Sequence, residues 1–273
     1  MKKTFSYILA GFALVSGLQS CSFFALDNLD GPKETIVGKV IDVETGEPVL
    51  TEQNSRGIRV RLTELSYGDN VSHNPDFYAM PDGTYRNTKI FKGHYNVTVD
   101  GPFIPIVRTD PDNFIIEDGS VNTDIRNTTT VNFMVQPFLK VEIVGEPVVS
   151  GGVVTAQVLV TRATSKEEFK AKVEPMGGWN DNFTNVTDVR LFVGYSSTVD
   201  SNNQYSSWSN VIDYGGDQFE KSIGTPITIS SRGTLKAGRK LFIRAAARIN
   251  YSTAGERRYN FSEVREINVP EAE

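Results

Sequence analysis

The sequence predicts an all-β protein built from two consecutive β-sandwich domains. Short runs of β-branched and aromatic residues alternate with polar residues along most of the chain, which is typical of strands with one buried face. Clusters rich in Gly, Asn and Asp separate these runs, and such clusters form turns. Gln136-Pro137-Phe138 stands between two of the runs, and its proline prevents one continuous ladder. We therefore expect two domains, residues 34–136 and 137–273, held in a fixed relation by a short connection.

The first 20 residues have the pattern of an export signal. A basic start precedes a mostly apolar run over residues 7–18, which is too short to span a membrane comfortably. Leu18-Gln19-Ser20-Cys21 resembles the lipobox of bacterial lipoproteins. The resemblance implies cleavage just before Cys21, acylation of this residue and anchoring in the lipid bilayer. We expect the outer membrane, with the cell surface favoured over the periplasmic face. The alternative is an ordinary signal peptide with an incidental cysteine.

Composition excludes several classes of protein. Removal of residues 1–20 takes away two of the 28 basic residues and none of the 33 acidic ones, which leaves a formal charge of −7. This balance argues against nucleic acid as a partner, because nucleic-acid binding requires a basic surface. A single cysteine cannot form a disulfide framework, and the two histidines, His73 and His94, make a histidine-based metal site unexpected.

We interpret residues 21–33 as a tether between the anchor and the first domain. Asp27, Asn28 and Asp30 stand in a turn-rich stretch and offer oxygen atoms of the kind that bind Ca²⁺. Their spacing lacks the EF-hand pattern and its terminal Glu, so calcium is only an alternative here. We expect no metal and no cofactor.

The first domain is expected to contain a series of short strands. They are predicted over residues 36–42, 58–63, 84–86, 93–99, 113–116 and 129–135. Asp82-Gly83 is a hairpin signal. The order Gly-x-Val-x-Asp-x-x-Thr-Gly-x-Pro from Gly38, then Val-x-Leu, Asp-Gly-Thr-Tyr and Gly-x-Tyr-x-Val, resembles the transthyretin-like or carboxypeptidase-regulatory-like β-sandwich. The resemblance implies an accessory module that packs, spaces or binds. Tyr85, Tyr95 and Phe133 are expected in its core.

The second domain is expected to add one short helix to its strands. Strands are predicted over residues 139–144, 153–162, 189–195, 227–230, 240–250 and 258–269. Ser165 and Glu168 have the spacing of a capping box, with Phe169 and Val173 on one face of a helix to about residue 174. Leu-x-Ala-x-Arg-x-Leu-x-Ile-x-Ala-x-Ala, residues 235–247, resembles the sixth strand of a fibronectin type III sandwich. Leu241 stands where that fold has its buried corner tyrosine.

Over nearly its whole length the chain resembles a domain-of-unknown-function family of lipoproteins from Gram-negative gut anaerobes. The motifs that carry this resemblance are Asp-Asn-Leu-Asp-Gly-Pro (27–32), Thr-Gly-Glu-Pro (45–48), Asp-Gly-Thr-Tyr (82–85), Gly-Pro-Phe (101–103), Pro-Phe-Leu (137–139) and Tyr-Asn-Phe-Ser-Glu-Val (259–264). The resemblance implies an outer-membrane setting beside the transporter of a polysaccharide-utilisation system. It supplies no catalytic residues.

No established catalytic motif appears in the sequence. Gly-x-Ser-x-Gly, His-Glu-x-x-His, the phosphate loop and the dinucleotide fingerprint are all missing. A glycosidase needs only two carboxylates, roughly 5–9 Å apart, and sequence does not measure that separation. We therefore expect a protein without enzymatic activity, and a glycoside hydrolase is the less favoured alternative.

Aromatic loops are the best candidates for a binding site. Trp and Tyr rings can cover the flat C–H faces of sugars, while Asn and Asp side chains bond their hydroxyls. Trp179 stands beside Asn180 and Asn182, and Trp208 stands near Tyr205, all in predicted loops. We expect these five residues to contact glycan. The alternative is that each tryptophan closes one end of its sandwich as part of the core.

Together these observations predict a membrane-anchored accessory lipoprotein that binds a polysaccharide or oligosaccharide within an uptake system. A second hypothesis fits the missing chemistry equally well. In that hypothesis the protein is a non-catalytic spacer or an assembly subunit of an outer-membrane transporter complex.

Overall fold

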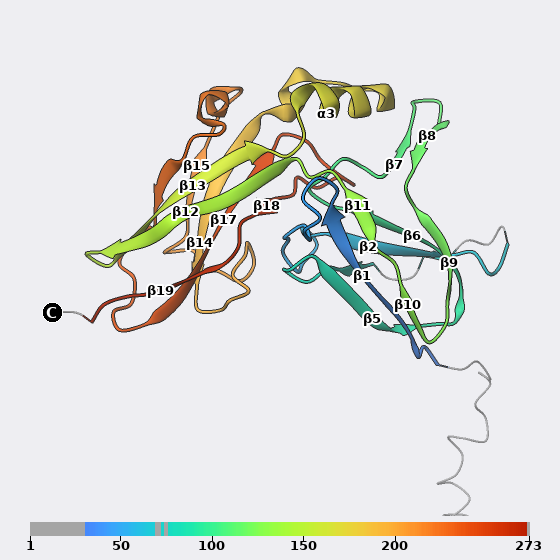
Figure 1. The fold of residues 1–273 in the computed structure, drawn as a ribbon, viewed down its shortest axis with the longest axis horizontal. Helices are drawn as coiled ribbons and strands as arrows, with labels where there is room; N and C mark the ends of the chain where they lie inside the picture. The colour runs from blue at the N-terminus through green and yellow to red at the C-terminus, as the bar shows by residue number, and fades with distance from the viewer. Residues whose placement is uncertain (1–30, 69–71, 74–75, 272–273) are drawn as a thin grey trace, which may run out of the picture.

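The computed structural model describes residues 31–271 except 69–71 and 74–75. Strands make up close to half of the described chain, and they build two sandwiches side by side (Figure 1). The all-β prediction is confirmed, whereas the closer likeness to transthyretin and fibronectin type III folds stays a prediction. Cys21 and the oxygen-bearing tether residues Asp27, Asn28 and Asp30 lie outside the described residues, so their assigned roles also stay predictions.

The N-terminal sandwich is organised around its first strand. In one sheet β1 (Glu34–Asp42) pairs antiparallel with β5 (Thr84–Ile90) and in parallel with β10 (Thr128–Thr130) and β11 (Phe133–Val135). The single predicted strand over 129–135 is therefore divided between two pairings with β1. The second sheet consists of β2 (Arg59–Glu64), β3 (Ser72–His73), β4 (Phe77–Tyr78), β6 (Gly93–Asp100) and β9 (Val121–Ile125).

The core of this sandwich follows from period-two patterning. Along β2 every second residue is buried, as expected for a strand with one face against the core. Tyr85, Tyr95 and Phe133 are buried, which confirms their prediction as core residues. The Tyr85 hydroxyl donates a hydrogen bond to the carbonyl oxygen of Val131 at 2.5 Å, and this bond satisfies a polar group inside an apolar cluster.

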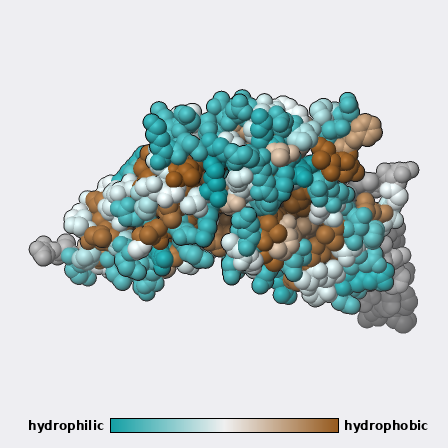
Figure 2. Space-filling model, turned by 45° about the horizontal axis from the view of Figure 1, so that its top comes forward, coloured by the Kyte–Doolittle hydropathy of each residue, from teal (hydrophilic) through white to brown (hydrophobic). Residues whose placement is uncertain are grey.

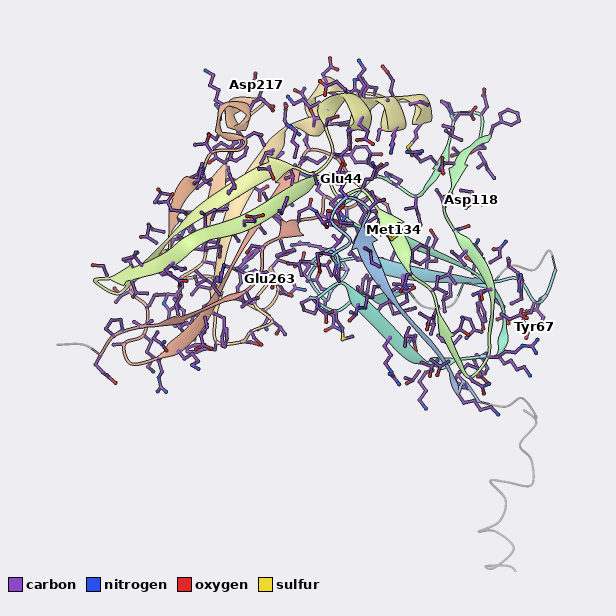
Figure 3. The ribbon with its side chains drawn as sticks, viewed as in Figure 1. Glu44, Tyr67, Asp118, Met134, Asp217 and Glu263 are labelled. Carbon is purple, nitrogen blue, oxygen red and sulfur yellow. The ribbon has the colours of Figure 1, made fainter. Side chains whose placement is uncertain are left out.

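A two-stranded arm projects from the N-terminal sandwich. It consists of β7 (Val107–Thr109) and β8 (Ile115–Asp118), which pair only with each other among the described residues (Figure 1). The arm exposes large apolar side chains: Phe114 is 71% exposed and Ile115 is 67% exposed. Figure 2 shows the apolar atoms projecting at the upper right, and Figure 3 shows Asp118 on the same arm.

The C-terminal sandwich packs a three-stranded sheet against a larger one. In the first sheet β12 (Leu139–Ser150) pairs with β13 (Val153–Arg162), which pairs with β16 (Ile227–Ser230). The second sheet consists of β14 (Val186–Gly194), β15 (Asn210–Asp213), β17 (Lys240–Ile249), β18 (Asn260–Phe261) and β19 (Arg265–Asn268). The predicted final strand is divided at Ser262, whose backbone carbonyl accepts a hydrogen bond from the side chain of Arg244.

The predicted helix is α3 (Lys166–Val173). Ser165 caps it, because its hydroxyl accepts a hydrogen bond from the Glu168 backbone N–H at 3.1 Å, and Phe169 and Val173 are buried beneath it. Short 3-10 helices occupy Glu174–Met176, Asp181–Thr184 and Gln218–Ser222. In the part of the chain that the structure describes, no helix has both the length and the apolar character needed to cross a membrane.

The two sandwiches meet at the outer face of the β14–β17 sheet. A small apolar cluster lies there, in which Leu50 of the N-terminal sandwich packs beside Phe192 and Phe261. Buried Arg258 donates hydrogen bonds to the backbone carbonyls of Ser55 and Gly57 across this junction. Asn260 Nδ2 donates to the carbonyl of Pro102 at 3.1 Å. Because apolar burial and hydrogen bonds both cross it, the junction joins the sandwiches tightly.

Candidate functional site

Trp179 is anchored at the rim of the C-terminal core. Its ring lies 5.9 Å from the Phe169 ring and 5.8 Å from the Phe183 ring, centroid to centroid. The indole Nε1 donates to Asp181 Oδ1 at 2.8 Å, and Lys170 Nζ lies 5.6 Å from the ring centroid. The ring is therefore only partly accessible, and its polar atom is already paired within the protein.

The two predicted asparagine partners of Trp179 are exposed and shape the local turn. Asn180 Oδ1 accepts from the Asn182 backbone N–H at 2.9 Å and so caps the following 3-10 helix. Asn182 Oδ1 accepts from Asn185 Nδ2 at 3.0 Å. Both side-chain oxygens bond within the loop, so this region matches the core-lid alternative more closely than an open sugar platform.

Trp208 is a core residue. Only 8% of its surface is exposed, and its Nε1 donates to the backbone carbonyl of Thr234 at 3.1 Å. Its ring belongs to the apolar cluster between the two C-terminal sheets. The expectation that Trp208 contacts glycan directly is therefore corrected: a buried ring with a paired N–H supports other groups.

Trp208 supports two exposed tyrosines, which we call the tyrosine face: Tyr195 and Tyr205. Tyr205 is 49% exposed and stacks on Trp208, with ring centroids 4.4 Å apart and an interplanar angle of 26°. Tyr195 is 47% exposed and lies 5.4 Å from Trp208 at 61°. The two tyrosine rings meet edge to face at 5.5 Å. The face thus presents aromatic surface to solvent on a buried aromatic base.

The loop that carries the tyrosine face, residues 195–209, is cross-linked by its own hydrogen bonds. Asp200 is buried, and its Oδ1 accepts from the backbone N–H groups of Asn202 and Asn203, both at 2.8 Å. The Tyr205 N–H donates to the carbonyl of Val193 at 2.8 Å. Such bonding fixes the backbone beneath the exposed rings.

The structure does not bring all the predicted site residues together. Trp179 precedes β14 and Trp208 follows it, and this nine-residue strand is about 27 Å long. Tyr195 was missed by sequence reasoning. The available signal was its register: Val189, Leu191 and Val193 face the core, and residue 195 continues that series where the strand ends.

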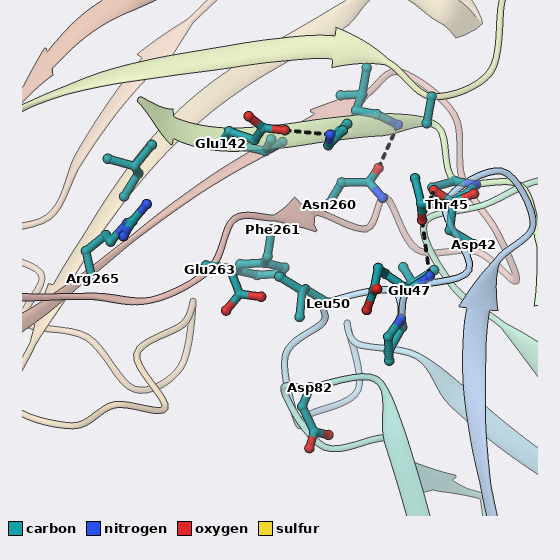
Figure 4. A pocket seen from close by; sticks show the side chains of 18 residues that line it. Asp42, Thr45, Glu47, Leu50, Asp82, Glu142, Asn260, Phe261, Glu263 and Arg265 are labelled. Atoms are coloured by element: carbon teal, nitrogen blue, oxygen red, sulfur yellow. Dashed lines mark hydrogen bonds and ion pairs between the residues drawn. The ribbon is translucent and has the colours of Figure 1, made fainter. Parts of the chain in front are cut away.

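A cleft of about 680 Å³ opens between the two sandwiches (Figure 4), and we call it the junction cleft. Its acidic lining consists of Asp42, Glu47, Asp82, Glu142 and Glu263. Several of these groups are already engaged: Asp42 Oδ2 accepts from the Thr45 hydroxyl at 3.1 Å, and Glu142 pairs with Lys140 at 2.7 Å. Glu263 lies on the side of the C-terminal sandwich that faces the N-terminal one (Figure 3). Over the described residues, no group of three or more His, Cys, Asp or Glu side chains is placed to hold a metal ion.

Comparison with known proteins fits this two-sandwich architecture. A family model described as "Protein of unknown function (DUF3823) N-terminal domain" matches residues 34–136. The crystal structure of a DUF3823 family protein from Bacteroides uniformis is 58% identical, with a TM-score of 0.85 over 88% of this chain and 100% of that one. The chain belongs to the DUF3823 family.

More distant structures share the DUF3823 fold. A protein from Bacteroides uniformis described as a putative carbohydrate binding protein is 19% identical, with a TM-score of 0.60 over 88% of this chain and 100% of that one. A DUF3823 family protein from Parabacteroides merdae is 16% identical, with a TM-score of 0.58 over 87% of this chain and 100% of that one. No curated protein matches the chain.

Proposed function

We propose that this DUF3823 protein is a non-catalytic lipoprotein that binds glycan through the tyrosine face. The observation that carries the proposal is a pair of half-exposed tyrosine rings, Tyr195 and Tyr205, fixed on buried Trp208. A ring held in this way covers an apolar sugar face at little entropic cost, because few rotamers remain to be lost. Asn202 and Ser206 are exposed in the same loop and offer hydrogen-bond partners for sugar hydroxyls.

A second line of support is the similar structure described as a putative carbohydrate binding protein, which has the same fold. Fold alone does not determine function, so the tyrosine face carries the argument and the likeness supports it.

The anchor is the other half of the proposal. Acylated Cys21 would hold the protein in the outer membrane, and the sandwiches would face the cell exterior. Cys21→Ser is expected to move the protein from the membrane fraction to the soluble fraction, because stable anchoring requires the acyl chains. Protease treatment of intact cells tests the surface orientation: a protein that stays intact while a known surface protein is cleaved faces the periplasm.

Glycan binding is tested by calorimetry and affinity electrophoresis of the mature protein against a panel of polysaccharides. We expect Tyr205→Ala and Tyr195→Ala each to weaken binding at least about tenfold. Tyr67→Ala is the matched control, because Tyr67 is a 61% exposed tyrosine of the N-terminal sandwich (Figure 3), whereas the tyrosine face belongs to the C-terminal one. Unchanged affinity in both test variants would show that the site lies elsewhere.

One observation favours the assembly-subunit hypothesis as a second candidate. The β7–β8 arm exposes Phe114, Ile115 and Ile116 together, and contiguous apolar surface of this kind marks protein contacts. The partner in this hypothesis is the outer-membrane transporter. Co-purification of the transporter with the wild-type protein but not with a Phe114→Ser, Ile115→Ser double variant, together with no glycan retention, would favour assembly over glycan binding.

A further inference from the structure

A second cavity at the junction is lined by arginines, and we call it the arginine pocket. It has a volume of about 530 Å³ and takes Arg56 from the N-terminal sandwich and Arg190, Arg248 and Arg257 from the C-terminal one. Arg190 lies on β14 and Arg248 on β17, on the outer face of that sheet. A cavity of this size admits a ligand no larger than a few sugar units.

A buried carboxylate orients two of these arginines. Asp188, whose side chain is 2% exposed, accepts from Arg248 Nε at 2.7 Å and from Arg190 Nε at 3.0 Å. Tyr259 donates its hydroxyl to the same carboxylate. Each guanidinium therefore meets Asp188 through Nε. Within the described part of the chain, the two terminal amino groups of Arg248 have no hydrogen-bond partner.

The Tyr259 ring holds the same two guanidinium groups from one side. The central carbon of the Arg248 guanidinium lies 4.6 Å from the ring centroid, and that of Arg190 lies 5.5 Å away. Two planar cations are thus fixed by a carboxylate and a ring, and the terminal amino groups of Arg248 remain available at the wall of the pocket. Arginine so held binds planar carboxylates and tetrahedral oxyanions in a bidentate manner.

The charge of the pocket is opposite to that of the protein. Four arginines and one carboxylate, Glu256, line the cavity, and Asp188 behind it adds a second carboxylate. Buried Glu52, which accepts from Ser201 in the lining, is a third carboxylate, so the side chains there leave an excess of one positive charge in a chain whose formal charge is −5. A local excess of this sign, facing a cavity, attracts anions and strengthens their binding.

We infer that the arginine pocket binds the anionic group of an acidic glycan, either the carboxylate of a uronic acid or a sulfate ester. The inference rests on the proposed function, because the same loop serves both sites: Ser201 and Gln204 line the pocket, and Tyr205 is the next residue. The tyrosine face would contact the sugar ring, and the arginines would select the charged residue of the chain.

The test compares matched acidic and neutral polysaccharides by calorimetry on the mature protein at fixed ionic strength. Polygalacturonate against its methyl ester tests the carboxylate, and dextran sulfate against dextran tests the sulfate. We expect at least about tenfold tighter binding of one acidic member. The double variant Arg56→Gln, Arg257→Gln should abolish that preference. Both residues are exposed, and neither bonds to Asp188. The matched control is Arg86→Gln with Arg239→Gln, which removes the same charge from exposed sites outside the pocket.

A second variant tests whether a loss of acidic binding comes from misfolding instead of from the lost arginines. Arg248→Lys keeps the charge beside Asp188 but lacks the planar fork, so it should weaken acidic binding more than neutral binding, and thermal unfolding of the variant checks that it is folded. Equal affinity for the acidic and the neutral polysaccharide of each pair would overturn the inference. A preference for the acidic one that survives in the Arg56/Arg257 double variant and in Arg248→Lys would overturn it as well. If Tyr205→Ala abolishes binding of the neutral polysaccharide, the proposal that the tyrosine face binds glycan would still stand in that case. Acidic binding that Tyr205→Ala leaves intact but the arginine variants remove would overturn the tyrosine face alone.

Discussion

Arg244 of the C-terminal sandwich donates a hydrogen bond to the backbone carbonyl of Thr51 in the N-terminal sandwich, at 2.9 Å. The same guanidinium donates to the carbonyls of Ser262 at 2.9 Å and Pro81 at 3.3 Å, and the residue is 1% exposed. Burial lowers the pKa of Arg244 to about 10, because removal from water disfavours the charged form, and the group remains charged at neutral pH. One side chain thus satisfies carbonyl groups from both sandwiches.

Arg244→Met should lower the free energy of unfolding by about 3 kcal/mol, because buried carbonyl groups on both sides of the junction lose their donors. Urea denaturation at pH 7 measures this loss. Arg239→Met is the control, since Arg239 is exposed one residue before β17, and its effect should stay within about 0.5 kcal/mol. Equal effects of the two substitutions would contradict a structural role for the buried arginine.

Asp188 should make stability depend on pH in the acid range. Burial alone would raise the pKa of Asp188, but hydrogen bonds from Tyr259, Arg248 and Arg190 outweigh burial and hold it below its usual value. A carboxyl whose pKa is lowered by folding stabilises the folded state fully above its unfolded pKa of about 3.9. That contribution is lost as the pH falls through the folded pKa.

We therefore expect Asp188→Asn to lower the free energy of unfolding at pH 7 by about 3 kcal/mol, since two arginines lose their counter-charge. The difference in the free energy of unfolding between wild type and variant should become smaller below about pH 4. Urea denaturation at pH 7, 5 and 3.5 measures both effects. Asp217→Asn, at an exposed position (Figure 3), provides the control, and a gap that is constant with pH would argue against the role of the Asp188 carboxylate.

Gly38 should tolerate no side chain. A Cβ placed there would lie 1.8 Å from the carbonyl oxygen of Val131 and 2.5 Å from the hydroxyl of Tyr85. Gly38→Ala should therefore destabilise the protein by about 3 kcal/mol or more, because the β1 backbone must move away from β5 and from the segment before β11. Thermal unfolding with Gly215→Ala as the control tests this, since a Cβ at residue 215 meets only ordinary contacts.

Substitutions of Trp208 and Tyr205 should differ in their effect on stability, because Trp208 is part of the core and Tyr205 is half exposed. Trp208→Ala is expected to lower the free energy of unfolding by about 3–5 kcal/mol, because it opens a cavity in the core. Tyr205→Ala should cost about 1 kcal/mol or less, since half of the residue is exposed. Urea denaturation of both variants checks the contrast, and similar losses would mean that the exposed ring is itself part of the core.

The fold was largely predictable because many strands, β2 among them, alternate between a buried and a less buried face. Alternation alone predicts β2, and the Ser165 and Glu168 pair predicts the start of α3. The divided strands were not predictable, because their breaks depend on distant partners: residue 262 leaves the ladder where its carbonyl meets the side chain of Arg244. A hydrogen bond between residues 18 positions apart cannot be predicted from the local sequence pattern.

The candidate site was only partly predictable. Sequence placed Tyr205 and Trp208 in one loop, but whether a ring is buried depends on which strands close above it. Arg56, Arg190 and Arg248 could not be grouped at all, because they come from three separate segments of the chain. Only the tertiary junction brings these arginines around one cavity.

Tight docking of the two sandwiches also bears on how fast and how tightly a ligand binds. A ligand that touches Arg56 and Arg248 together meets both walls already in place, because folding has fixed their separation. No domain closure needs to precede the encounter, so binding does not pay for ordering one sandwich against the other. Association should then be limited by diffusion and orientation, and the free and occupied backbones should superpose within about 1 Å.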